Sequence, residues 1–571
     1  MRRILIAVGL LGAVILVLLF QTRGPSVSEG SVLLVELGGR YLEGPAPPLL
    51  SRLVSEPARP LASVLSSLAM AERDQRLAAV VFRIRDLDIG FAKAQELHQA
   101  LLRLRERGRR PIAYLEVESF TGANLEYYVA SAAEELYLAP GTDSPLLGLA
   151  AETLLFGGLL ERLGVEVEVA RIGRYKSAAE VFSRKEMSDA FREVTESLLD
   201  SFEGQLVSGI AAARGLGPDA VREAIDAAPV GAQGLLARKL ADGERFLDEI
   251  LDELGRERVV KEAVYAAQDP SAVGFEPVAR VALVYGSGPV VTGSGRGRPG
   301  GDPVLAADTV AEALRTAAED EDFDAILFRI DSPGGSALAS DRVWRAVARA
   351  REAKPVVASF SDVAASGGYY VACGANAIVA EPTTLTGSIG VFVLRPVIAG
   401  LLDRLDIGYE TFTRGRFAGL ATSTRPLDEE SSRRLAAQVA EVYATFVDRV
   451  AEGRGLDAAA VDRAGQGRVY TGEQALARGL VDELGGLRAA VGRIRTELGL
   501  AEDADVALFP HPPPPTLAEQ IRQALSGVAV AGAGLPAEQV LPRALREWLA
   551  VVRAVPAGSP LALLPVALEL R

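Results

Sequence analysis

One serine, at the junction of a strand-like run and a glycine-rich run, has the setting of a nucleophile. Ser366 stands in the sequence Asp-Val-Ala-Ala-Ser-Gly-Gly at residues 362–368. The apolar run 356–360 before it is typical of a buried strand, and the small apolar residues 367–375 favour a buried helix. At such a turn the hydroxyl projects from the backbone, and the glycines let a carbonyl group approach. The pattern predicts covalent catalysis, although any small residue also suits a tight turn.

Few residues of this chain can serve as the base that such a serine needs. There are two histidines, His98 in an amphipathic run and His511 before four prolines, so a Ser-His-Asp arrangement is not expected. Of the 61 basic residues six are lysines and the rest are arginines, which keep their protons at neutral pH. A lysine can act as the base when burial lowers its pKa. With Cys373 as the single cysteine, we expect no zinc or other cofactor and no internal disulfide.

The chain contains a tandem duplication. Residues 127–130, Tyr-Tyr-Val-Ala, recur at 369–372, and Gly-Arg-Tyr at 173–175 recurs as Gly-Arg-Phe at 415–417, both at an offset of 242. Strand-like runs alternate with helical runs in each copy, which is the pattern of parallel α/β units. The sequence therefore predicts an α/β protein made of two tandem copies of one domain.

The two copies differ at the residues that could do chemistry. At the offset of 242, Ser366 aligns with Asn124 and Lys176 aligns with Ala418. The turn Ser-Pro-Gly-Gly at 332–335 also has no counterpart in the first copy, and its amides could face a developing oxyanion. Each copy thus carries one half of a possible Ser/Lys pair.

Four motifs of the second copy, taken with the duplication, are similar to those of a known family. They are Asp-Ser-Pro-Gly-Gly-Ser at 331–336, Ala-Ala-Ser-Gly-Gly-Tyr-Tyr at 364–370, Thr-Gly-Ser-Ile-Gly-Val at 386–391 and Gly-Leu-Val-Asp-Glu-Leu-Gly at 479–485. Over about residues 1–500 the chain resembles the bacterial signal peptide peptidase A (protease IV) family in its long duplicated form. The resemblance implies tandem Clp protease/crotonase-like domains, a Ser/Lys dyad and a bowl-shaped homotetramer. It also implies hydrolysis of apolar peptides, such as signal peptides left in the membrane.

The resemblance also implies a role for each site residue. Ser366 corresponds to the nucleophile, Lys176 to the general base, and Ser388 to a hydroxyl that holds the lysine. The implied oxyanion hole is formed by backbone amides of Gly335, Gly334 and Gly367. Lys185 is the fallback for the base, and whether Lys176 serves its own chain or a neighbour stays open.

The N-terminal stretch predicts a membrane anchor. Residues 4–20 are uncharged and mainly apolar, which is the short end for a spanning helix, and no small-x-small cleavage site follows. Arg2 and Arg3 outweigh Arg23, so we expect a cytoplasmic N-terminus and a catalytic body on the outer, periplasmic side of the cytoplasmic membrane. The predicted division of the chain is anchor and tether 1–29, first repeat 30–265, second repeat 266–500, and proline-rich spacer and amphipathic tail 501–571.

The net charge of the chain bears on which classes of molecule it can bind. The net charge of -14 argues against nucleic acid, whose phosphates would be repelled. Two further interpretations remain beside the peptidase. One is a crotonase-type acyl-CoA enzyme, because the fold and the glycine-rich turn are shared. The other is a membrane scaffold that kept the fold without activity.

Overall fold

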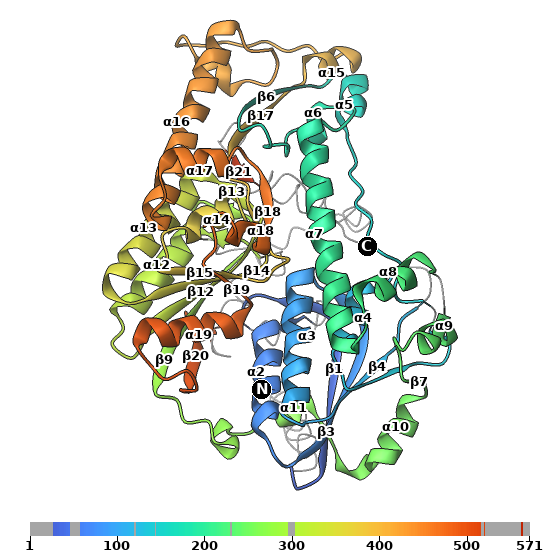
Figure 1. Cartoon of the computed structure of the whole chain (residues 1–571). Coiled ribbons are helices and arrows are strands. Elements are labelled where there is room, and N and C mark those ends of the chain that lie inside the picture. Colours follow the sequence, from blue (N-terminus) through green and yellow to red (C-terminus); the bar gives the residue numbers. More distant parts are fainter. Residues whose placement is uncertain are drawn as a thin grey trace, which may run out of the picture.

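The computed structural model describes residues 27–45, 58–118, 122–142, 144–228, 231–294, 303–514, 519 and 561–563 (Figure 1). The predicted anchor at 4–20 lies outside these residues. Within the described ranges, no helix is long and apolar enough to cross a membrane.

The first α/β unit is built on a parallel sheet with the order β2-β1-β3-β4-β5-β7, in which β8 also pairs with β1. Its strands are buried on both faces, which explains why β3 carries a nearly continuous apolar run rather than an alternating pattern. The strands are β1 (Ser31–Leu42), β2 (Arg59–Pro60), β3 (Leu77–Asp88), β4 (Pro111–Leu115), β5 (Glu135–Leu138), β7 (Gly243–Glu244) and β8 (Val259–Lys261). The helices around them are α2 (Leu61–Arg73), α3 (Phe91–Glu106), α4 (Asn124–Ser131), α8 (Pro218–Asp226), α9 (Gly231–Ala237), α10 (Leu247–Leu254) and α11 (Glu262–Tyr265).

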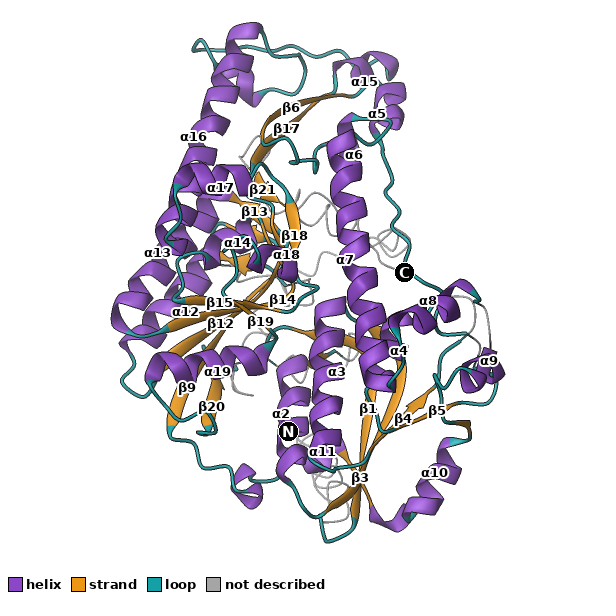
Figure 2. Ribbon diagram, in the orientation of Figure 1, coloured by secondary structure: helices purple, strands orange, loops and turns teal. Residues whose placement is uncertain are grey.

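The second α/β unit repeats this plan with the order β18-β16-β14-β12-β9-β20, and β15 and β19 branch from β14. Its strands are β9 (Ala279–Ser287), β12 (Ala325–Ser332), β14 (Val356–Ala365), β15 (Ala377–Ala380), β16 (Leu385–Gly387), β18 (Val469–Thr471), β19 (Glu483–Leu484) and β20 (Val506–Pro510). Its helices are α12 (Ala307–Glu319), α13 (Ala337–Ala353), α14 (Gly367–Ala372), α17 (Ala458–Ala464), α18 (Gly472–Leu476) and α19 (Leu487–Leu498). In Figure 2 the second unit lies at the upper left and the first at the lower right, and together they confirm the predicted tandem α/β architecture.

A third sheet joins the two repeats. Its order is β11-β10-β13-β21-β17-β6, with bounds β6 (Glu166–Ile172), β10 (Val290–Val291), β11 (Leu305–Ala306), β13 (Gly334–Ser336), β17 (Val391–Val397) and β21 (Leu561–Leu563). Strand β6 comes from the first repeat and pairs antiparallel with β17 of the second along its whole length, from Ile172 opposite Val391 to Glu166 opposite Val397. The first repeat therefore extends a strand into the second.

Two long helices, α7 (Asp189–Arg214) and α16 (Glu429–Arg454), are equivalent elements of the two repeats. Each begins with a side chain that accepts a hydrogen bond from the first turn, Ser188 from Phe191 and Asp428 from Ser431. Each ends at a left-handed glycine. The upper end of α7 lies near the short helices α5 (Gly157–Leu163), α6 (Glu180–Ser183) and α15 (Ala399–Arg404), whereas α16 stands on the other side of the molecule (Figure 1).

The beginning of the predicted tail is part of the second unit. Strand β20 lies within the range 501–571, and it pairs parallel with β9 at the edge of the second sheet, from Val506 opposite Ala279 to Pro510 opposite Leu283. Residues 506–510 of the range predicted as spacer and tail are therefore a paired strand of the second unit, and Pro510 is its last residue. An edge strand tolerates proline since one side of it needs no donor.

Candidate active site

Ser366 lies where the sequence placed it, between the end of β14 and the start of α14. Its backbone has a φ of 56°, a left-handed conformation that is costly for a residue other than glycine. The turn is held on both sides, since Ser366 donates its N–H to Gly387 O at 2.8 Å and accepts from Tyr370 N at 2.8 Å. A strained, fixed turn of this kind directs the hydroxyl to one place.

Lys176 follows β6, so the strand that crosses between repeats also delivers the lysine. The backbone of Tyr175 donates to Gln466 O at 2.8 Å, which ties the lysine loop to the second repeat. Glycines allow this close approach. A Cβ at Gly467 would come within 2.6 Å of the Lys176 backbone nitrogen, and a Cβ at Gly173 would come within 2.6 Å of Gln466 O.

The structure brings three of the predicted site residues together. Lys176 Nζ lies 2.7 Å from Ser366 Oγ, 2.9 Å from Ser388 Oγ and 3.0 Å from Ser388 O, and all three residues are fully buried. A neutral amine can donate its two N–H groups to the two Ser388 oxygens. Its lone pair then faces the Ser366 hydroxyl, which is the geometry needed to accept that proton. In this structure the lysine and the serine belong to the same chain.

Burial lowers the pKa of Lys176 well below its usual value. The acidic neighbour in sequence, Glu180, does not oppose this effect at the amine. Its carboxylate is paired with Arg171 at 2.8 Å and accepts from the Ser188 hydroxyl at 2.9 Å. The amine therefore faces hydroxyl and carbonyl oxygens and no carboxylate among the hydrogen-bond partners that the structure gives it.

The glycine-rich turn distinguishes between its two predicted donors. The Gly334 N–H is directed to Ser332 Oγ at 3.3 Å, and that hydroxyl in turn donates to Gly288 O at 2.7 Å. At Gly335 a Cβ would lie 2.2 Å from Val290 O, so only glycine fits. Gly367 opens α14, where a backbone N–H has no acceptor within the helix. The Gly334 N–H is therefore engaged within the turn, whereas the Gly367 N–H is not used by its own helix.

A second buried lysine supports this site and was not foreseen from the sequence. Lys93 Nζ, on α3 of the first repeat, is paired with Asp331 at 2.7 Å and with Asp362 at 2.5 Å. Asp331 directly precedes the glycine-rich turn, and Asp362 lies on β14 four residues before Ser366. Asp362 also accepts the backbone N–H groups of Gly90 and Lys93 at 3.0 Å each. One side chain of the first repeat therefore ties together the two segments that form the site.

The same contact between repeats continues into a network of buried charges. Arg329 of β12 is paired with Glu43 at 2.7 Å and, more closely, with Glu96, and both acids belong to the first repeat. Nearby, burial and the charge of Glu96 raise the pKa of Glu381 to about 8. Local sequence gives little signal for this network, because Arg329, Glu43, Glu96 and Glu381 come from four separate segments. Only a polar residue inside a strongly apolar run, such as Arg329 in Ala-Ile-Leu-Phe-Arg-Ile, points to a buried partner.

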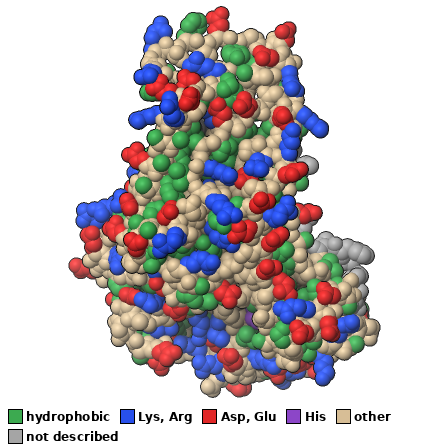
Figure 3. Space-filling view, turned by 45° about the horizontal axis from the view of Figure 1, so that its top comes forward, with side chains coloured by type: hydrophobic (Ala, Val, Ile, Leu, Met, Phe, Trp, Pro, Cys, Tyr) green, Lys and Arg blue, Asp and Glu red, His purple; other side chains and the backbone are tan. Residues whose placement is uncertain are grey.

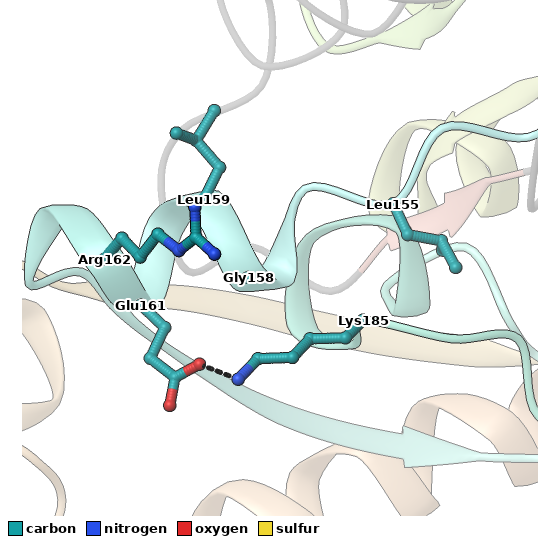
Figure 4. A pocket seen from close by; sticks show the side chains of 6 residues that line it. All are labelled: Leu155, Gly158, Leu159, Glu161, Arg162 and Lys185. Carbon is teal, nitrogen blue, oxygen red and sulfur yellow. Dashed lines mark ion pairs between the residues drawn. The ribbon is translucent and has the colours of Figure 1, made fainter.

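Lys185, the fallback for the base, lies elsewhere. It lines an open pocket of about 650 Å³ beside helix α5, and its amine is paired with Glu161 of that helix (Figure 4). Its side chain is 65% exposed, so its amine is solvated and not part of the buried cluster. The residues aligned with the pair also have other surroundings, since Asn124 donates to Gly148 O at 2.9 Å and Ala418 lies in a short 3-10 helix.

Comparisons with known proteins agree with this geometry. The model of peptidase family S49 matches residues 111–261 and 348–501, one match in each repeat. The chain is 33% identical over 522 residues to the chloroplastic serine protease SPPA of Arabidopsis thaliana, covering 90% of this chain and 75% of that protein. It is 28% identical over 509 residues to protease 4 of Salmonella typhi, covering 86% and 78%.

A shorter relative matches one part of the chain. The putative signal peptide peptidase SppA of Enterococcus faecium is 33% identical over 190 residues, which is 33% of this chain and 55% of that protein. Because the family model matches both repeats and the long relatives match most of the chain, the chain belongs to peptidase family S49 and is a serine peptidase.

Proposed function

We propose that this protein is a membrane-anchored endopeptidase in which Ser366 is the nucleophile and Lys176 is the general base. The observation that carries the proposal is the 2.7 Å separation of Lys176 Nζ and Ser366 Oγ in a buried setting. At pH 7 an ordinary lysine is neutral only about one time in two thousand, whereas full burial lowers its pKa by roughly 3–5 units. A buried lysine without a carboxylate partner is therefore a competent base.

In the first half of the reaction, Ser366 Oγ attacks the carbonyl carbon of the scissile peptide bond while Lys176 Nζ takes the hydroxyl proton. The negative charge that develops on the carbonyl oxygen is bound by the N–H groups of Gly335 and Gly367. When the C–N bond breaks, the Lys176 ammonium returns the proton to the departing amine. The product of this half is an acyl-enzyme on Ser366.

In the second half, water attacks the acyl carbon and Lys176 Nζ accepts a proton from it. The same ammonium then protonates Ser366 Oγ as the ester bond breaks, which restores both residues. Ser388 keeps the amine in place throughout, because its Oγ and O lie within 3.0 Å of Nζ. Two N–H donors are thereby engaged, and the lone pair is directed to the serine.

We propose apolar peptides in the membrane as the substrates, signal peptides first among them. The resemblance to the signal peptide peptidase family and the name of the Enterococcus faecium relative support this substrate class. The apolar run 4–20 supports a retained anchor with the catalytic body on the periplasmic side. Fractionation should then find the full-length chain in the cytoplasmic membrane. Recovery of a soluble product that begins near residue 24 would contradict the anchor.

A fluorophosphonate probe tests the proposed chemistry. It should label the wild-type protein and fail to label Ser366→Ala, and the labelled peptide should contain residue 366. Labelling of neither protein would favour the alternative of a scaffold without activity. The crotonase alternative is less favoured by the geometry near the turn, because the carboxylates of Asp331 and Asp362 are both engaged by Lys93.

We further propose that the chain assembles into a closed ring of four copies, and the duplication supports the contact. In the present chain β6 of the first repeat pairs with β17 of the second. The segments equivalent to these strands by the offset of 242 are 408–414 and 149–155, and neither range is a strand in the described structure. Pairing of 408–414 with 149–155 of a neighbouring copy would repeat the observed contact and continue around a ring.

Exposed apolar side chains mark both segments. Leu154 is 59% exposed and Phe412 is 83% exposed, and Figure 3 shows apolar side chains among charged ones in this upper part of the molecule. Phe412→Asp should lower the mass measured by light scattering to that of a single copy. Leu338→Asp is the control, since Leu338 is also an apolar, exposed residue but lies on α13. An unchanged mass for Phe412→Asp would contradict this contact.

A further inference from the structure

A short segment from the far end of the chain lies inside the joint sheet beside the candidate active site. Residues 561–563 form β21, which separates β13 from β17 in the strand order. On one side β21 runs antiparallel to the glycine-rich turn, with Leu561 opposite Ser336 and Leu563 opposite Gly334. On the other side Leu561 is opposite Phe392 of β17. The segment is thus held by backbone pairing on both edges.

The backbone position of β21 is the one expected of a bound peptide. Ala562 is opposite Gly335, one of the two proposed oxyanion donors, and β21 also lies against α14, which begins directly after Ser366. A peptide added as a strand to this edge would have its carbonyl groups beside the turn and the nucleophile. Main-chain pairing of this kind binds extended peptides with little regard to sequence, and side-chain pockets then select among them.

Leu561 occupies such a pocket. Its side chain packs against an apolar cluster that includes Ala178 and Ala179, which follow Lys176, together with Val291 and Phe392. The pocket is therefore built from both repeats, directly after the proposed base. Residues 560–568, Pro-Leu-Ala-Leu-Leu-Pro-Val-Ala-Leu, are uncharged throughout. Leu561, which belongs to this apolar stretch of the sequence, thus lies in a pocket suited to apolar side chains.

From these contacts we infer that residues 561–563 occupy the substrate groove as a built-in competitor, and that a substrate peptide must displace them. The inference rests on the proposed peptidase function. A groove that is open for only part of the time binds its ligand more weakly in proportion to that fraction. If β21 fills the groove about three quarters of the time, the apparent KM rises about fourfold while kcat is unchanged. The segment also indicates what the groove prefers, namely an extended peptide with a branched apolar side chain opposite Phe392.

The test compares full-length chains with a fluorogenic apolar peptide as substrate. Leu561→Asp places a carboxylate in the apolar pocket and should release β21, so KM should fall about fourfold at unchanged kcat. Val278→Asp also replaces a branched apolar residue by Asp, at an exposed position before β9, and should leave both constants at the wild-type values. A synthetic peptide of residues 556–567 should then inhibit Leu561→Asp competitively, and the same peptide carrying Leu561→Asp should not.

The outcomes separate this inference from the function on which it rests. A lower KM for Leu561→Asp with competitive inhibition by the peptide supports the inference. Equal KM values for wild type and Leu561→Asp, or inhibition by neither peptide, overturn it while leaving the peptidase intact. No hydrolysis by any of the chains, with no fluorophosphonate labelling of Ser366, overturns the proposed function and this inference with it.

Discussion

Lys93 and Lys176 are both buried lysines that the first repeat extends into the second, and their surroundings shift their pKa values in opposite directions. Lys93 faces Asp331 and Asp362, whose charges outweigh burial and hold its pKa above the usual value. Lys176 faces Ser366 and Ser388, and burial lowers its pKa well below the usual value. Burial is common to both, so the carboxylates decide the difference.

The difference in surroundings suits the two lysines to two different roles at the interface between the repeats. A charged lysine between two carboxylates fixes the segments before the turn and before the nucleophile. A neutral lysine among hydroxyl and carbonyl oxygens can take a proton. The duplication makes the division possible, because the second copy supplies the serine and the turn while the first supplies both amines.

The largest expected effect is the loss of activity when either half of the proposed pair is removed. Ser366→Ala and Lys176→Ala should each lower kcat by about 10³-fold or more, and the double variant should be little worse, because the two residues act as a unit. The measurement is peptide hydrolysis, with thermal unfolding as a check on folding. Lys185→Ala is the matched control and should keep wild-type kcat, since Lys185 is solvated and paired with Glu161. Near-normal turnover by Lys176→Ala would show that another group is the base.

Removing the other lysine should act on stability first. Lys93→Met leaves the half-buried carboxylates of Asp331 and Asp362 without their cation, which costs about 3 kcal/mol of unfolding free energy. Lys93 is a positioning residue, so kcat should also fall while the pH at which activity appears stays unchanged. Urea unfolding and a pH–activity profile measure these effects, and Lys239→Met, at an exposed lysine, is the control. If Lys93→Met shifts the pH profile, Lys93 takes part in the proton transfer and the comparison fails.

Replacing Lys176 should raise the free energy of unfolding at neutral pH, whereas replacing Lys93 should lower it. Because its pKa is lower in the folded protein than the unfolded value of about 10.4, the unfolded chain binds the additional proton between these two values. The free energy of unfolding of the wild type therefore rises with pH across that window. Lys176→Met removes this dependence and should be more stable than the wild type at neutral pH, by about 1.4 kcal/mol for each unit of pKa displacement. Equal stability at all pH values would mean that the amine is not desolvated.

The sequence alone predicted the two residues of the candidate pair, but it did not predict the residues and strand pairings that hold them in place. Ser366 could be predicted because a strand, a small residue and glycines are adjacent in sequence, and Lys176 because the copies could be compared at one offset. Lys93 gave no such signal, since its two partners lie more than 230 residues away and its neighbours, Ala92 and Ala94, are those of an ordinary helix. The strand pairing of β6 with β17 and the place of β21 are equally non-local. The local periodicity of a sequence predicts helices and strands, but it does not predict which strands pair with one another.

The smallest expected effect is at Ser388. Ser388→Ala removes one acceptor of the Lys176 amine, the Oγ at 2.9 Å, and leaves the carbonyl at 3.0 Å. We expect kcat to fall about tenfold with KM unchanged, since losing one hydrogen bond of about 1–1.5 kcal/mol loosens the base without removing it. Steady-state kinetics give both constants. A change confined to KM would show that Ser388 contacts substrate instead.

The rate at which a fluorophosphonate acylates Ser366, measured against pH, tests the central claim most directly. If Lys176 is a neutral base in the resting protein, the wild-type rate should rise through one ionisation well below the ordinary lysine value of about 10.4. In Lys176→Ala that ionisation should disappear, and the rate should stay low at every pH. The account is contradicted if Lys176→Ala retains the wild-type profile, or if the wild-type rate rises only near the ordinary lysine pKa.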